Sequence, residues 1–151
     1  MAQIEQLIVR DISPAHYHAS ATAVWCYDER FRILLEDLYH FYDFQYIDTF
    51  RTAGGAKDLA VMVATFEAKY ILTQIKRSVE FHQSSHILLM VHDTCSAYGD
   101  QIPKDKKEKL EFFAQELSKA EKLVSRFLKD FGYTPEIRKY IADFDGLMIV
   151  R

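Results

Sequence analysis

The sequence predicts an α/β fold, in which a mainly parallel β-sheet of about four parallel strands plus a C-terminal antiparallel edge strand is flanked by helices. Short apolar runs alternate along the chain with longer segments whose apolar residues recur every three or four positions. That alternation is typical of parallel strands joined by right-handed helical crossovers. The last two apolar runs flank Asp145-Gly146, a dipeptide that favours a tight hairpin turn and therefore predicts an antiparallel edge.

Length and charge limit the classes of protein that fit. A chain of 151 residues suits a single domain, here divided into an N-terminal arm (1–20) and an α/β core (21–151). The net charge of −3 offers no long-range attraction for nucleic acid or anionic lipid, so neither is expected as a partner. Because no apolar segment reaches membrane-spanning length and the N-terminus lacks the order of a signal peptide, we expect a cytoplasmic location.

The first half of the chain contains two strand and helix pairs. Thr22 to Tyr27 is a strand candidate, and the helix predicted from Arg30 to Tyr42 carries a one-sided apolar stripe that includes Phe41. Phe44 to Phe50 is a second strand, followed by a flexible turn at Ala53-Gly54-Gly55. A second helical pattern runs from about Leu59 to His82.

The second half begins with Ile87 to Val91, which is apolar throughout and therefore predicts a strand buried on both faces. After a polar loop, the strongest helical periodicity of the chain runs from Leu110 to Phe131 and ends near Gly132. Ile137 to Phe144 and the four residues after Gly146 complete the predicted hairpin. In the arm, His16 and His18 are interpreted as solvated side chains, since no neighbouring residue completes a site.

Soft-metal ligands follow two of these strands. Cys26 ends the first strand, and His92 and Cys95 follow the third. If these strands are neighbours, with the second strand outside the first, the three side chains meet where the strand order reverses. Two thiolates and one imidazole provide three ligands for Zn²⁺ and leave a fourth position for water or a carboxylate. The alternative is two buried thiols that act as small apolar side chains, as expected for cysteines in a reducing compartment.

Asp28 lies two residues beyond Cys26, within reach of such a metal or its water. Arg30 is placed to hold Asp28 in a bidentate ion pair. With these residues, the chain resembles the β-class carbonic anhydrases. The family's Cys-x-Asp-x-Arg is matched by residues 26–30, its His-x-x-Cys by residues 92–95, and its Arg-x-Ala-Gly by residues 51–54. A closing segment, 140–147, is also similar to the family pattern.

The resemblance implies that Cys26, His92 and Cys95 bind Zn²⁺ and that Asp28 and Arg30 form a catalytic dyad. A zinc-bound hydroxide would attack carbon dioxide to give bicarbonate, and the proton would leave through Asp28. The resemblance also implies a homodimer or higher homo-oligomer. It further implies that Asp28 can become a fourth metal ligand when it leaves Arg30. Two alternatives stay open: a hydrolase of carbonyl sulfide or carbon disulfide, and a non-catalytic or regulatory zinc-binding protein.

Overall fold

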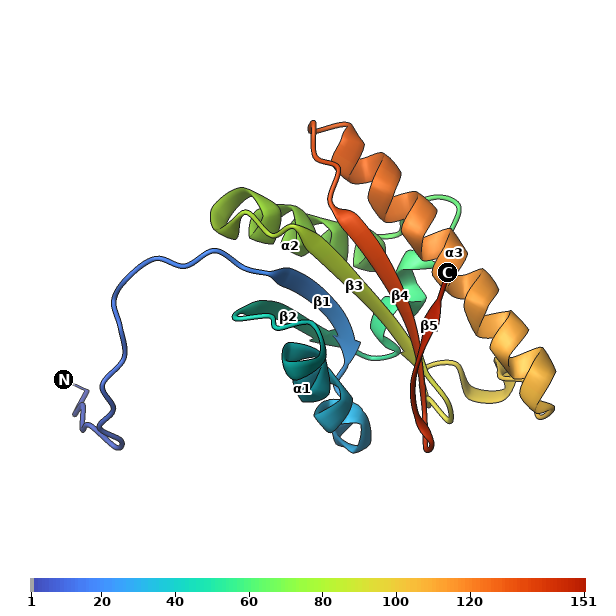
Figure 1. Cartoon of the computed structure of the whole chain (residues 1–151), viewed down its shortest axis with the longest axis horizontal. Coiled ribbons are helices and arrows are strands. Elements are labelled where there is room, and N and C mark those ends of the chain that lie inside the picture. The colour runs from blue at the N-terminus through green and yellow to red at the C-terminus, as the bar shows by residue number, and fades with distance from the viewer. Residues whose placement is uncertain (1) are drawn as a thin grey trace.

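The protein is built on a five-stranded β-sheet with the strand order β2-β1-β3-β4-β5 (Figure 1). The structure, a computed structural model, describes residues 2–151. Its strands are β1 (Ala21–Cys26), β2 (Ile47–Thr52), β3 (His86–His92), β4 (Glu136–Asp143) and β5 (Gly146–Val150). Its helices are η1 (Glu29–Phe31), α1 (Arg32–Phe41), η2 (Gly55–Leu59), α2 (Phe66–His82), η3 (Gly99–Gln101) and α3 (Lys106–Lys129), where η denotes a 3₁₀ helix.

Strands β1 to β4 are mutually parallel, and β5 pairs antiparallel with β4. This confirms the predicted α/β class and the antiparallel edge strand. The chain runs outward from β1 to β2 and then crosses back to β3, so α1 lies on one face of the sheet and α2 and α3 on the other (Figure 1). The strand order therefore reverses between β1 and β3, as the sequence argument required.

The central strands form the core. Residues 87–91 of β3 are fully buried, which confirms the prediction of a strand covered on both faces. Helix α3 covers the sheet with the apolar face that its periodicity predicted. Asp105 caps the start of this helix, because its carboxylate accepts hydrogen bonds from the backbone N–H groups of Lys107 and Glu108. Among residues 2–151, no helix is both long enough and apolar enough to cross a bilayer.

Two details of the predicted helices were wrong. The helix expected from about Leu59 begins at Phe66, because Thr65 is extended and its hydroxyl caps the backbone N–H of Ala68. The residues before it form η2, which starts from the left-handed backbone of Gly54. Phe41, expected on the buried stripe of the first helix, is 77% exposed because it is the last residue of α1 and lies beyond the covered face.

Strands β1 and β3 separate near their carboxyl ends. Their pairing runs from Thr22 opposite Ile87 to Val24 opposite Leu89 and stops there. Each strand continues on its other side, where Cys26 pairs with Thr52 of β2 and His92 pairs with Ala142 of β4. The sheet is therefore split between Cys26 and His92, which opens a crevice at the reversal point.

Candidate metal centre

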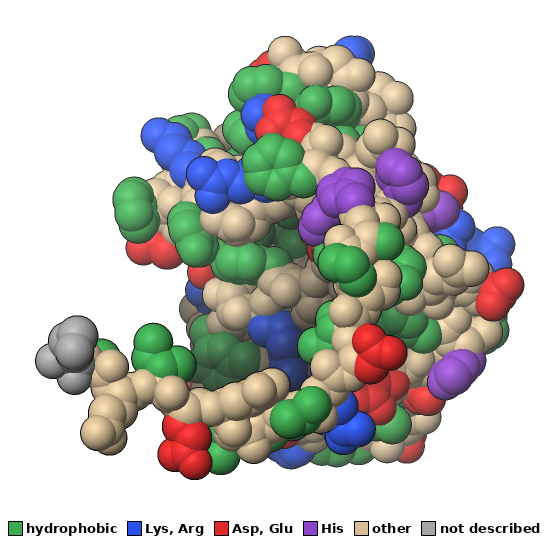
Figure 2. All heavy atoms as spheres, turned by 90° about the vertical axis from the view of Figure 1, so that its left-hand side faces the viewer, with side chains coloured by type: hydrophobic (Ala, Val, Ile, Leu, Met, Phe, Trp, Pro, Cys, Tyr) green, Lys and Arg blue, Asp and Glu red, His purple; other side chains and the backbone are tan. Residues whose placement is uncertain are grey.

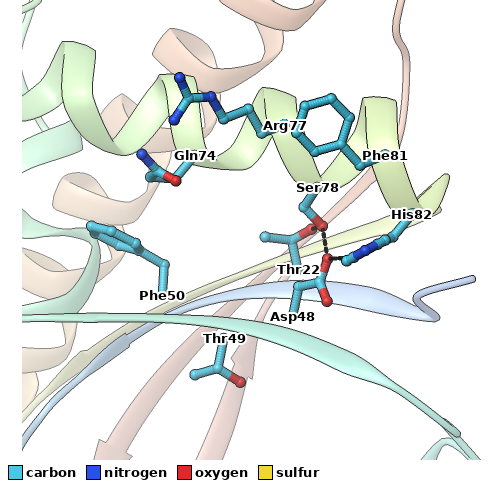
Figure 3. Close-up of a pocket in the computed structure, with 9 residues that line it drawn as sticks. All are labelled: Thr22, Asp48, Thr49, Phe50, Gln74, Arg77, Ser78, Phe81 and His82. Atoms are coloured by element: carbon cyan, nitrogen blue, oxygen red, sulfur yellow. Dashed lines mark hydrogen bonds and ion pairs between the residues drawn. The ribbon is translucent and has the colours of Figure 1, made fainter. Parts of the chain in front are cut away.

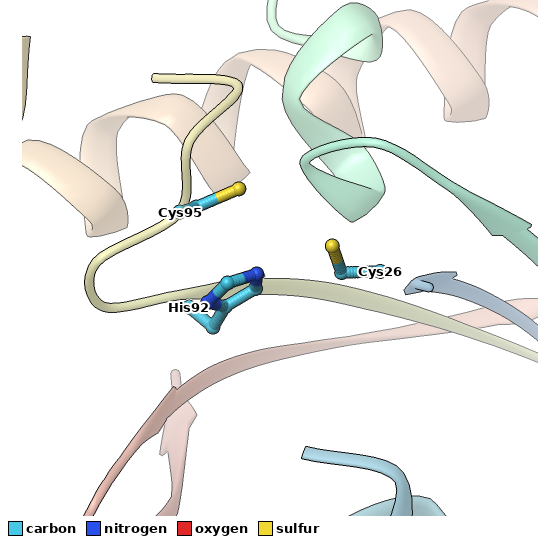
Figure 4. A group of neighbouring side chains, drawn as sticks. All are labelled: Cys26, His92 and Cys95. Atoms are coloured by element: carbon cyan, nitrogen blue, oxygen red, sulfur yellow. The ribbon is translucent and has the colours of Figure 1, made fainter. Parts of the chain in front are cut away.

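Three buried side chains converge in this crevice. Cys26 comes from the end of β1, His92 from the end of β3, and Cys95 from the turn that follows β3. One ligand atom of each residue lies within 4.8 Å of those of the other two, and Figure 4 shows both sulfur atoms and the imidazole turned toward a common point. The split sheet thus brings together residues from distant parts of the chain.

The imidazole of His92 is held in one orientation. Its Nδ1–H donates to the carbonyl oxygen of Asp93 at 2.7 Å, which leaves Nε2 with the lone pair that a metal needs. The Asp93 carboxylate is fixed in turn by the ammonium of Lys109 at 2.7 Å and by the backbone N–H of Thr94 at 2.7 Å. Within the described chain, Nε2 of His92 is buried without a hydrogen-bond partner and lies 4.0 Å from Oδ2 of Asp28.

Cys26 is the more acidic of the two thiols. The nearby Cys95 thiol and the backbone N–H groups of Asp28 and Gly54 stabilise the Cys26 thiolate, so the pKa of Cys26 falls well below its ordinary value although burial opposes ionisation. The same contact and burial raise the pKa of Cys95. Burial opposes a charge on His92, but the neighbouring Cys26 thiolate raises the pKa of His92. The crevice therefore concentrates negative charge on sulfur.

Asp28 and Arg30 form a bidentate ion pair beside the crevice. Arg30 donates from Nε to Oδ1 at 2.9 Å and from Nη2 to Oδ2 at 2.6 Å, and its backbone N–H donates to Oδ1 at 3.1 Å. These bonds lower the pKa of Asp28 to about 2, so its carboxylate is ionised throughout the neutral range. The Arg30 guanidinium also lies 5.6 Å from the ring centres of Phe31 and Phe144, and these cation–π contacts help to hold it beside Asp28.

The donor set fits a divalent metal ion such as zinc. Two sulfur atoms and one imidazole are ligands that zinc prefers, and the unpartnered Nε2 of His92 is a buried polar atom that such an ion would satisfy. Beside these atoms is a cavity of about 100 Å³. Residues from three segments line it: Tyr27 and Asp28, Ala53 and Gly54, and Ser96 and Ala97.

The turn at Gly54-Gly55 fills the split between β1 and β3. Gly55 has a left-handed φ of +59°, and a Cβ atom there would lie 2.2 Å from the carbonyl oxygen of Met90 and 3.3 Å from the backbone nitrogen of Cys26. Only glycine combines that backbone conformation with so close an approach. The turn that brings the Gly54 N–H to the Cys26 sulfur thus depends on the absence of a side chain at position 55.

We expect Gly55→Ala to destabilise the protein by roughly 3 kcal/mol, since it adds a steric clash in the core to a left-handed backbone penalty. Urea unfolding followed by circular dichroism measures this. Gly132→Ala is the matched control, because Gly132 has a φ of +81° but open space around its Cα. That variant should lose only about 1 kcal/mol. Equal losses in the two variants would contradict the proposed close packing at Gly55.

The structure also brings together residues that the sequence argument did not single out. The contact between Lys109 and Asp93 joins α3 to the turn after β3, and no local pattern predicts it. At the other end of the sheet, Asp48 accepts hydrogen bonds from Ser78 and His82 in a pocket of about 260 Å³ (Figure 3). No local pattern predicts this contact, because Asp48 and His82 lie far apart along the chain.

Comparison with known proteins agrees with this architecture. A family model described as a putative carbonic anhydrase matches residues 17–134. No curated protein matches the chain significantly. The fold is similar to that of a carbonic anhydrase from Glaciozyma antarctica, at 13% identity and a TM-score of 0.52, over 91% of this chain and 85% of that one. It is also similar to the β-carbonic anhydrase CafD of Aspergillus fumigatus, at 13% identity and a TM-score of 0.50, over 92% and 91% of the two chains.

Proposed function

This chain belongs to the putative carbonic anhydrase family, and we propose that it reversibly hydrates carbon dioxide to bicarbonate at a zinc ion bound by Cys26, His92 and Cys95. The observation that carries the proposal is the convergence of these three ligand atoms within 4.8 Å, next to the ion pair of Asp28 and Arg30. Zinc held by such ligands supplies the Lewis acidity that makes water nucleophilic near neutral pH.

In this proposal, Asp28 orients the reacting water and Arg30 orients Asp28. Oδ2 of Asp28 lies 4.0 Å from the metal-facing nitrogen of His92, within reach of a water molecule in the cavity. Because its two oxygens are held by Arg30, the carboxylate points in a fixed direction and stays off the metal. Because it stays ionised, the carboxylate accepts a hydrogen bond from that water and directs the water's proton toward solvent.

Stopped-flow carbon dioxide hydration by the zinc-loaded protein at alkaline pH tests the activity. A rate above that of buffer is expected, and no rate from a protein that holds one zinc per chain would reject the lyase proposal. In that case the same preparation distinguishes two alternatives. Turnover of carbonyl sulfide or carbon disulfide would identify a hydrolase, and inertness toward all three molecules would identify a non-catalytic zinc-binding protein.

We expect Lys109→Met to weaken zinc binding about ten-fold, the usual cost of losing a residue that orients a metal ligand. Lys109 acts on the site through Asp93: its ammonium binds the Asp93 carboxylate, and the Asp93 carbonyl oxygen accepts the hydrogen bond that orients the His92 ring. Competition with a chromophoric chelator measures the dissociation constant. Lys106→Met is the control, since Lys106 is exposed and its one ion pair within residues 2–151 is with the exposed Asp145. Equal affinities of the two variants would show that Lys109 does not orient the site.

We also propose that the protein forms at least a homodimer in the cytoplasm. The N-terminal segment projects from the core (Figure 1), and large apolar side chains on it are exposed. An apolar groove of about 420 Å³ lies between α1 and β5. Exposed apolar surface of this kind favours association between copies. Sedimentation velocity at micromolar concentration would separate a dimer from a monomer.

A further inference from the structure

The N-terminal segment is attached to the protein beside the last turn of α2. The hydroxyl of Tyr17 donates to Oδ1 of Asp48 at 2.7 Å, and Nε2 of His16 donates to the carbonyl oxygen of Phe81 at 2.9 Å. The Tyr17 ring also lies over the His82 ring, with ring centres 4.2 Å apart. Residues 16–18 are therefore held next to His82, at the end of the sheet opposite to the candidate metal centre.

His82 is oriented by a carboxylate. Its Nδ1–H donates to Oδ2 of Asp48 at 2.7 Å, and Ser78 donates to the same oxygen at 2.6 Å (Figure 3). Burial opposes ionisation of Asp48, but the hydrogen bonds from Ser78, Tyr17 and His82 lower the pKa of Asp48 below its ordinary value. Among the described residues, Nε2 of His82 makes no hydrogen bond, and 26% of the side chain is exposed. Histidines that bind a metal through one ring nitrogen commonly donate the other ring N–H to a carboxylate, as His82 does here.

The ring of His16 lies beside that of His82, and the ring of His18 lies beside that of His16. The ring centres of His16 and His82 are 5.3 Å apart, and those of His16 and His18 are 6.1 Å apart. Three imidazoles on one tetrahedral zinc ion have ring centres roughly 5 Å apart, given the zinc–nitrogen distance. Figure 2 shows histidine side chains gathered on the face from which the N-terminal segment projects.

We propose that His16, His18 and His82 form a second metal site, for a divalent transition-metal ion such as zinc, with Asp48 as the residue that positions His82. Within residues 2–151, only Cys26, His92 and Cys95 already have their ligand atoms within 4.8 Å of one another, so the second site closes by movement of the exposed His18 ring. His16 offers Nδ1 as its ligand atom, because its Nε2–H donates to the Phe81 carbonyl oxygen. An all-imidazole site suits zinc, nickel and copper(II). Bound metal would fasten the N-terminal segment to the end of α2.

The test is a count of zinc equivalents in the full-length protein, by competition with a chromophoric chelator. The second site predicts two equivalents in the wild type. His18→Gln should remove the weaker equivalent and keep the tighter one, and this exposed side chain makes no hydrogen bond among the described residues that folding would need. His82→Gln should have the same effect, whereas His40→Gln, at an exposed position on α1, should retain both equivalents.

Asp48→Asn should lower the affinity for the second zinc equivalent at least ten-fold and leave that for the first unchanged. A weakened but retained second equivalent indicates that Asp48 positions His82 and does not bind the metal itself. Copper(II) electron paramagnetic resonance adds a readout independent of stability, because coordinated imidazoles produce nitrogen hyperfine lines that His18→Gln should reduce. A single zinc equivalent in the wild type, or a second one that persists in both His18→Gln and His82→Gln, would overturn the proposal. The tighter zinc equivalent belongs to the centre formed by Cys26, His92 and Cys95. Cys95→Ser should remove that equivalent and leave the second one, so failure of one site is distinguished from failure of the other.

Discussion

Asp28→Asn should lower the rate of carbon dioxide hydration by about 100-fold while the protein keeps its zinc, since a positioned proton acceptor typically contributes at least that factor. Asparagine has the shape of aspartate but presents an amide in place of one carboxylate oxygen. The oxygen that lies 4.0 Å from Nε2 of His92 would no longer accept a proton, and the two-point pair with Arg30 would be weakened. None of the three proposed metal ligands is altered.

Stopped-flow hydration assays and elemental analysis of the same preparation measure both halves of this expectation. Asp37→Asn, an exposed carboxylate on α1, is the matched control and should retain the full rate. An unchanged rate in Asp28→Asn would exclude Asp28 from the reaction. Loss of zinc in that variant would instead assign Asp28 to the metal, as the fourth ligand that the resemblance implies.

Cys95→Ser should abolish tight zinc binding and lower the melting temperature by roughly 10 °C. Metal that binds only the folded state adds about 4 kcal/mol of stability when its concentration is a thousand times the dissociation constant. In a domain of this length, each kcal/mol lost lowers the melting temperature by roughly 2–4 °C, so the full loss corresponds to roughly 10 °C. Serine is close to cysteine in size, so little of the effect would come from a packing defect around the buried position 95.

Calorimetric melting with and without a strong chelator separates metal from packing. The zinc-loaded wild type should melt well above Cys95→Ser, and chelator should bring the two together. Ser96→Ala, a change at the exposed next residue of the same turn, should keep both the metal and the melting temperature. If Cys95→Ser melted like the zinc-loaded wild type, the stabilising role of metal at this centre would be wrong.

Much of the fold follows from local patterns. The five apolar residues from Ile87 to Val91 predicted a strand covered on both faces, and all five are fully buried. The start of α2 was predicted too early because two decisive features, the left-handed turn at Gly54 and the cap at Thr65, are backbone conformations that an apolar pattern does not reveal. Apolar periodicity shows which face of a helix is buried but does not determine the residues at which the helix begins and ends.

The candidate centre was predictable only in part. Residue types and strand ends identified Cys26, His92 and Cys95, but their meeting depended on a strand order that the sequence argument had to assume. The structure shows β1 beside β3 with β2 outside, which places the reversal between them. Their assignment as zinc ligands, and that of Asp28 and Arg30 as the dyad, stay predictions for the experiments above.

By itself, the sequence determined the α/β class, the buried central strand and the family resemblance, because these depend on residue types at short spacings. The tertiary structure alone decided the split between β1 and β3, the close approach of Gly55 to Met90, and the contacts of Lys109 with Asp93 and of Asp48 with His82. These contacts join residues from separate elements. Their geometry depends on how the helices pack on the sheet, which no local pattern encodes.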